Sequence, residues 1–183
     1  PVYARSAREI GWPLAQLARC HDQFRDERFL ARAKEYFDAA RTFVEPRRGV
    51  FVQCHGGVSY RGAVGFMNGF LAYGLIRYHR ATHDPAALAL LRDLSEGLAA
   101  ETQVAPGSFR YSPNPENNVG NTGSGASPLF GGLFGYLYLQ TGDPCYRQLA
   151  RECFDYLLAN PDMIRMDRMH ISGWMMKGLA GDK

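Results

Sequence analysis

The chain has 183 residues, of which 46% are hydrophobic and 13% aromatic, and its formal net charge is +3. This length suits one domain with its own core, and the apolar content excludes a disordered or fibrous protein. Basic residues are interspersed with acidic ones, so no nucleic-acid partner is expected. The longest apolar stretch, Ala63–Ile76, is interrupted by Asn68 and is too short for a membrane span, so no membrane partner is expected.

The four cysteines predict neither a metal site nor a disulfide framework. No CxxC motif occurs, which argues against zinc. Cys145 and Cys153 stand eight residues apart on one predicted helix, roughly 12 Å along its axis, and this is too far for a mutual disulfide. We therefore expect buried, free thiols and no cofactor.

The chain begins with Pro1 and shows no signal peptide, as expected of a processed product or of a piece of a longer protein; the compartment stays open. A first helix is predicted to open near Trp12-Pro13. A second is predicted from about Glu27 to Val44, because apolar residues recur there at spacings of three and four. The segment 49–57 then has the character of a short strand.

The middle of the chain, 60–101, predicts a helical hairpin. An apolar helix, for which Tyr60-Arg61 is one possible opening, is followed by a turn at His83-Asp84 and by an amphipathic helix that begins at Pro85. Asp before Pro is a favourable helix start, because Asp accepts hydrogen bonds from free N–H groups and Pro lacks the donor that the first turn would waste.

The last third repeats this plan after a polar stretch, 102–126, that is rich in Gly, Asn and Pro. Ser127-Pro128 is predicted to begin an apolar helix, and Asp143-Pro144 an amphipathic one. A final segment, His170–Leu179, is predicted to form the first half of another hairpin.

The turn aspartates Asp26, Asp84 and Asp143 are separated by 58 and 59 residues, and apolar positions around them keep the same offsets. Gly49 and Gly107 in the following loops are again 58 apart. Several coincidences at one period predict a two-helix repeat within a single domain, 1–183. The predicted repeats are about 12–59, 60–117 and 118–165, with a partial repeat at 166–183.

The two helices of each repeat differ in polarity. The first is apolar nearly all round and carries glycines, as expected of a buried inner helix, whereas the second has a charged face, as expected of an outer helix. The predicted fold is therefore all-α, with stacked antiparallel helical hairpins in two layers. Tight turns join the helices at one end and long loops at the other, and loops of such length are usually functional.

This pattern resembles the (α/α) toroid proteins, which include the six-hairpin glycosidases and polysaccharide lyases of similar architecture. The resemblance covers about 12–182 and is carried by the layers, the loops and the turn Thr141-Gly142-Asp143-Pro144-x-Tyr146, with a degenerate copy at 82–85. The motif is generic and names no single family. A closed toroid has about six or seven hairpins and this chain about three and a half, which implies a partial or fragmentary toroid, or a short open array.

The resemblance implies that the long loops line a cleft and that the chain is a carbohydrate-active enzyme, or a domain of one, with a poly- or oligosaccharide as its partner. The candidate catalytic residues are His55, Tyr60, Arg61 and His170. The candidate substrate-binding residues are Tyr111, Glu116, Asn118, Asn121, Asp167 and Trp174.

A lyase acting on a uronic-acid glycan is favoured slightly over a glycoside hydrolase, because lyases of this architecture use Asn, His, Tyr and Arg. Proton abstraction beside a carboxylate requires neutralisation of that carboxylate, a base, and an acid for the leaving oxygen. The residues available for these three roles are, in that order, Asn118 or Asn121 with Arg61, His55 or His170, and Tyr60 or Tyr111.

Two alternatives stay open. A glycoside hydrolase needs a pair of carboxylates, and Glu116 and Asp167 are, with Asp162, the acids of the long loops. A non-catalytic helical-repeat module would instead bind a protein or a glycan through its loop face. The same residues can also have structural roles and no function in binding or catalysis. In that case the Asn cluster provides turns, His55 is a loop residue and the three turn aspartates are helix caps. The oligomeric state is not predicted.

Overall fold

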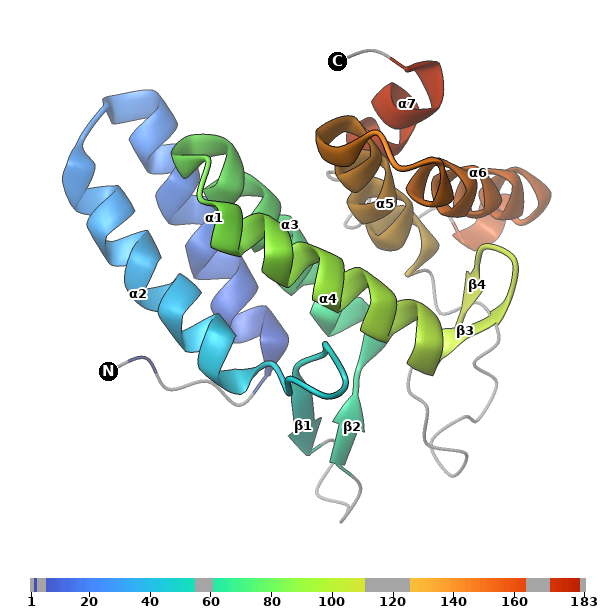
Figure 1. Cartoon of the computed structure of the whole chain (residues 1–183), viewed down its shortest axis with the longest axis horizontal. Coiled ribbons are helices and arrows are strands. Elements are labelled where there is room, and N and C mark those ends of the chain that lie inside the picture. The colour runs from blue at the N-terminus through green and yellow to red at the C-terminus, as the bar shows by residue number, and fades with distance from the viewer. Residues whose placement is uncertain (1, 3–5, 55–60, 111–125, 164–171, 182–183) are drawn as a thin grey trace.

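The computed structural model describes residues 2, 6–54, 61–110, 126–163 and 172–181. Figure 1 shows the helices of this part of the chain and two small hairpins of strands. The helices are α1 (Ala7–Phe24), α2 (Glu27–Phe43), α3 (Gly65–Thr82), α4 (Pro85–Thr102), α5 (Ser127–Thr141), α6 (Pro144–Ala159) and α7 (Ser172–Ala180). The strands are β1 (Val52–Cys54), β2 (Arg61–Ala63), β3 (Gln103–Ala105) and β4 (Ser108–Phe109), and a short 3₁₀ turn spans Pro161–Met163.

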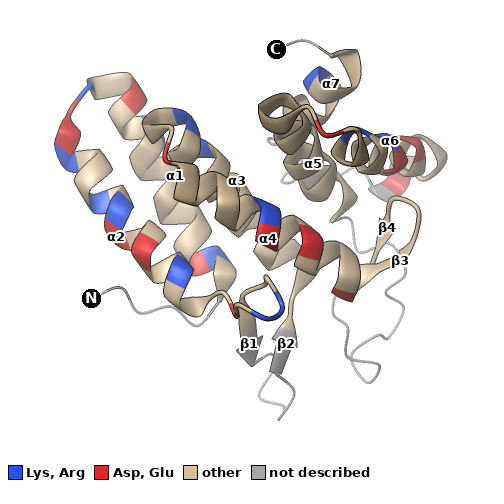
Figure 2. Cartoon of the chain, viewed as in Figure 1, with Lys and Arg blue, Asp and Glu red and all other residues tan. Residues whose placement is uncertain are grey.

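The helices form two layers, as predicted. The inner helices α1, α3, α5 and α7 pack each against the next, and α2, α4 and α6 pack as outer helices against their hairpin partners. Charged side chains lie mainly on the outer helices and on α1, whereas α5 has none (Figure 2). The all-α fold of stacked antiparallel hairpins is therefore confirmed.

Each tight turn is closed by the same device. A residue with left-handed backbone ends the inner helix, and the aspartate after it begins the outer one. The aspartate carboxylate accepts a hydrogen bond over 2.9 Å from the backbone N–H two residues further on. The prediction that the turn aspartates are helix caps is therefore confirmed for Asp26, Asp84 and Asp143. The cap satisfies an N–H group that the first helical turn leaves free.

The connections at the opposite end are also related by the repeat. Gly49 and Gly107 both have positive φ, 67° and 68°. A Cβ on Gly49 would lie 2.1 Å from the carbonyl oxygen of Asp93 in α4, and one on Gly107 would lie 2.0 Å from that of Glu152 in α6. Glycine is therefore required twice, for backbone conformation and for close packing. Each connection thus rests on the outer helix of the next hairpin.

Buried polar side chains tie these connections to the inner helices. Asn68 of α3 accepts from the N–H of Phe51 at 2.9 Å and donates to its carbonyl oxygen at 3.2 Å. The hydroxyl of Ser127 in α5 donates to the carbonyl oxygen of Gly107 over 2.7 Å. Asn68, the residue that interrupts the apolar stretch, is fully buried and holds the loop in place.

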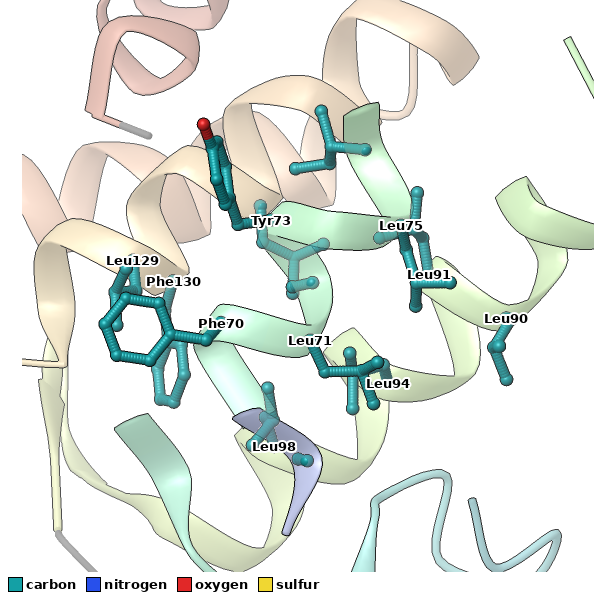
Figure 3. Close-up of a cluster of buried hydrophobic side chains, with 14 of the residues drawn as sticks. Phe70, Leu71, Tyr73, Leu75, Leu90, Leu91, Leu94, Leu98, Leu129 and Phe130 are labelled. Carbon is teal, nitrogen blue, oxygen red and sulfur yellow. The ribbon is translucent and has the colours of Figure 1, made fainter. Parts of the chain in front are cut away.

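The core lies between the layers. Figure 3 shows Leu71 and Leu75 of α3 directed toward Leu91 and Leu94 of α4, and all four are fully buried. The inner helices approach one another through glycines. A Cβ on Gly74 of α3, for example, would lie 2.4 Å from the carbonyl oxygen of Gly11 in α1. Burying such leucines contributes about 1.5–3 kcal/mol each within a hairpin. The close contact of Gly74 with Gly11 joins one hairpin to the next, so the hairpins stabilise one another.

Three predicted boundaries were wrong. The first helix begins at Ala7, and Pro13 lies inside it, because Ile10 and Leu14 are buried on its inner side and extend the helix in both directions. Arg61 does not open α3 but pairs in β2 with Cys54 of β1. The stretch after α4 is not without structure, because the left-handed backbone of Gly107 turns β3 into β4.

The cysteine prediction is correct only in part. Cys153 is buried and free, but Cys145 is exposed because it lies in the first turn of α6, and Cys20 is half-buried. None of the described helices is long and apolar enough to cross a membrane. The described residues bring no three His, Cys, Asp or Glu side chains together as metal ligands.

Candidate functional site

Most of the predicted site residues fall outside the described part of the chain. These are His55, Tyr60, Tyr111, Glu116, Asn118, Asn121, Asp167 and His170. Their segments are joined to the starts of inner helices: β2 leads into α3, Ala126 into α5, and Ser172 begins α7. The candidate site is therefore built from the inner helices, whose side chains are described.

One side of α3 faces away from α4 and carries a stripe at helical spacing. Figure 3 shows Phe70 and Tyr73 on the side of α3 opposite to Leu91 and Leu94. Steps of four, three, four and three along α3 place five residues on this side. Together with Trp12 of α1 and Trp174 of α7 they define what we call the inner surface: Phe66, Phe70, Tyr73, Arg77 and Arg80.

Aromatic rings occupy the half of the inner surface nearer the strands. Trp12 stacks on Phe70 with ring centroids 4.9 Å apart and meets Tyr73 edge-on at 6.2 Å. Phe66 meets Phe70 edge-on at 6.3 Å. Trp12 is 36% exposed although its neighbours Phe70 and Tyr73 are buried. An exposed indole held rigidly by buried rings is a surface on which a ligand can stack.

Cations occupy the other half. Arg77 and Arg80 are the charged residues of α3, and Lys177 is that of α7, whereas α5 has none. The Arg77 guanidinium lies 5.5 Å from the centroid of Tyr73. The described helices α3, α5 and α7 thus carry three cationic side chains and no carboxylate. Their charge favours an anionic ligand.

Trp174 is a predicted site residue that the structure describes. Its ring is half-buried and meets Tyr136 of α5 edge-on at 5.3 Å. The Arg80 guanidinium lies 4.8 Å from its centroid and the Lys177 ammonium 5.2 Å. Arg80 is in the last turns of α3, whereas β2 adjoins its first turn, and the helix is roughly 27 Å long. Trp174 and the Arg61 backbone therefore lie near opposite ends of α3.

A buried hydrogen bond supports this region from behind. Nδ1 of His79 and the hydroxyl of Tyr136 are 2.6 Å apart. Burial lowers the pKa of His79, the nearby His83 lowers it further, and Asp84 partly opposes this. Burial raises the pKa of Tyr136 to about 12. Both groups are therefore neutral near pH 7, and their bond joins α3 to α5 without access to solvent.

The groove beside Arg48 is not part of this site. It is lined by the connection after α2 and by one side of α4, including Gly49, Asp93 and Gly97. The Arg48 guanidinium donates to the Glu101 carboxylate there, so the ion pair fastens the connection to α4. None of the residues that line the groove belongs to the inner surface.

The inner surface was missed in the sequence although its spacing is visible there. Because α3 is apolar nearly all round, it was interpreted only as a buried helix, and the stripe that ends in two arginines was not separated from the leucines that face α4. Trp12 was interpreted only as a helix start.

Neither family models nor curated proteins match the chain. Solved structures do. An α-mannanase of glycoside hydrolase family 76 from Bacteroides thetaiotaomicron is 14% identical with a TM-score of 0.69, and the match covers 87% of this chain and 45% of that one. A glycosyl hydrolase of family 88 from Bacteroides vulgatus is 10% identical with a TM-score of 0.71, covering 90% of this chain and 51% of that one.

A third match is an inactive variant of the α-1,6-mannanase of Salegentibacter sp. HEL1_6, in complex with α-1,6-mannotetrose. It is 12% identical with a TM-score of 0.67, covering 86% of this chain and 48% of that one. These proteins are (α/α) toroid glycosidases, and the chain spans about half of their length. The described hairpins therefore have the fold of part of an (α/α) toroid, as the sequence predicted, and this is a fold of carbohydrate-active enzymes.

Proposed function

We propose that the chain is part of a carbohydrate-active enzyme that acts on an acidic poly- or oligosaccharide along the inner surface. The observation that carries this proposal is the inner surface itself, where the exposed ring of Trp12 lies on one side and the cations Arg77 and Arg80 on the other. Aromatic rings stack on sugar rings, and guanidinium groups pair with carboxylate or sulfate. The fold supports the class of enzyme by analogy.

The reaction that we place first is elimination beside a uronic carboxylate. The described inner helices α3, α5 and α7 provide positive charge, which such a carboxylate needs, and provide no acid. In this proposal Arg61 with Asn118 or Asn121 neutralises the carboxylate, His55 or His170 removes the proton, and Tyr60 or Tyr111 protonates the leaving oxygen.

Hydrolysis is the second candidate, because the solved structures of similar fold are glycoside hydrolases. It needs two carboxylates, for which this chain would use Glu116 and Asp167. The name of the mannanase variant attributes its inactivity to replacement of two consecutive aspartates by alanine, and no two consecutive aspartates occur in this chain. Within this chain, the two carboxylates would therefore not come from adjacent aspartates.

Incubation of the protein with alginate, glucuronan and sulfated uronic glycans tests the proposal. Elimination creates an unsaturated sugar that absorbs in the ultraviolet, and we expect this product together with new reducing ends. His55→Ala and His170→Ala identify the base, and exposed His83→Ala is the matched control. Reducing ends without absorbance would establish hydrolysis instead. Binding without any product would establish the non-catalytic module.

A further inference from the structure

Two cations and one aromatic ring form a cluster near the end of α3 that is remote from the strands, and no reaction step above uses it. We define the Trp174 cluster as Arg80, Trp174 and Lys177. Arg80 and Lys177 are exposed and come from different inner helices, α3 and α7, which both pack against α5. Two positive charges therefore lie beside one indole.

Among the described residues, no ion pair includes Arg80 or Lys177. The ion pairs of that part of the chain lie on α1, on α2, at the α1–α2 turn, within the connection after α2, and between that connection and α4. Two like charges repel, and the indole faces compensate this only in part, since a cation–π contact at an exposed site contributes about 0.5–1 kcal/mol. An anion placed between the two cations would remove the repulsion.

The indole of the cluster is also held in place. The Trp174 ring rests on Tyr136, which is buried and bonded to His79. The α7 backbone at Trp174 approaches α5 so closely that a Cβ on Gly135 would lie 2.3 Å from the Trp174 carbonyl oxygen. A fixed ring with two cations beside it needs little reorganisation to bind a ligand.

We propose that the Trp174 cluster is an anion subsite that binds the carboxylate or sulfate group of an acidic glycan. The guanidinium of Arg80 and the ammonium of Lys177 donate to the oxyanion, and the edge of Trp174 borders the sugar. The subsite lies at the opposite end of α3 from β2, so it holds a part of the glycan distant from the reacting bond. This inference rests on the proposed function for its ligand.

The test is a fluorescence titration. The chain has two tryptophans, so Trp12→Phe, which keeps a ring on Phe70, leaves Trp174 as the single indole reporter. A tetra-uronate, a sulfated tetrasaccharide and neutral mannotetraose are added separately. We expect saturable changes with one or both acidic ligands, none with the neutral one, and weaker binding as salt rises. Comparing the two acidic ligands identifies carboxylate or sulfate.

The deciding variant in this background is Arg80→Gln with Lys177→Gln. We expect its affinity for the acidic ligand to fall at least about tenfold. Arg19→Gln with Arg151→Gln removes the same charge from exposed positions on α1 and α6 and should leave the affinity within about twofold. Equal affinity in the two double variants, or equal binding of mannotetraose, would overturn the subsite.

Calorimetry on the wild-type protein and on Trp12→Phe separates failure of the subsite from failure of the proposed function. If the acidic ligand binds to Trp12→Phe in calorimetry but the fluorescence of Trp174 does not respond, the subsite is wrong and the proposed function stands. If none of the glycans binds in either measurement, both are wrong.

Discussion

At the scale of single residues, the structure depends on side chains that occupy equivalent places in successive hairpins. The turn aspartates show this most clearly, because each accepts a hydrogen bond from one backbone N–H over the same distance. They were predictable from sequence, because a cap is a local interaction between residues that are two or three positions apart. Asn68 was not, because its partner Phe51 lies 17 residues away.

Replacement of Asp143 by alanine should lower the free energy of unfolding by about 1 kcal/mol, because the N–H of Cys145 loses its acceptor. Asp143→Asn should retain most of the stability, since an amide oxygen also caps. Urea denaturation of both variants measures this. Asp155→Ala, at an exposed position within the same helix, is the control, and a loss as large as that of Asp143→Ala would argue against the cap.

The buried His79 should make stability depend on pH. Burial lowers its pKa in the folded protein below the ordinary value of 6.5. The unfolded chain therefore takes up the proton first as the pH falls, so stability is complete above pH 6.5 and is lost as the pH falls from there toward the folded pKa. Denaturation midpoints at a series of pH values measure the slope.

His79→Gln should flatten this slope, because glutamine does not titrate. His83→Gln, at an exposed position at the end of the same helix, should reduce the slope only in part, because burial is a larger cause of the lowered His79 pKa than His83 is. An unchanged slope in His79→Gln would mean that another group is responsible for the pH dependence.

At the scale of elements, the inner helices are held together by glycines rather than by side-chain interdigitation alone. This explains why they are apolar on nearly all sides and yet pack in a single row. The helices themselves were predictable from periodicity and turn residues. The position of α7 beside the middle of α5 was not predictable, because it depends on the contact between Gly135 and Trp174. These residues are far apart in the sequence, so no local pattern indicates that they meet.

Gly135→Ala should therefore destabilise the protein by about 1–3 kcal/mol, since its methyl group would meet the α7 backbone and helices would have to shift. Gly173→Ala is the matched control, because an added Cβ there meets no atom within 4 Å and alanine favours the helix. Thermal denaturation of the two variants should separate them clearly. Equal stabilities would show that α7 does not pack closely on α5.

At the scale of the whole molecule, the predicted two-layer array is confirmed as part of an (α/α) toroid. Fold class was accessible because a period of 58 and 59 residues repeats an amphipathic plan. The site was harder to predict. Sequence reasoning pointed to the long loops, most of whose candidate residues lie outside the described part of the chain. The surface proposed here is a side of α3 with Trp12 from another hairpin, and only folding brings these residues together.

Binding of a glycan to the inner surface can be measured by titrating an acidic tetrasaccharide into the wild-type protein and into Trp12→Ala in a calorimeter. We expect saturable binding to the wild type and affinity at least about tenfold lower for Trp12→Ala, because the exposed ring on Phe70 is lost. Equal affinity in the two proteins would contradict it.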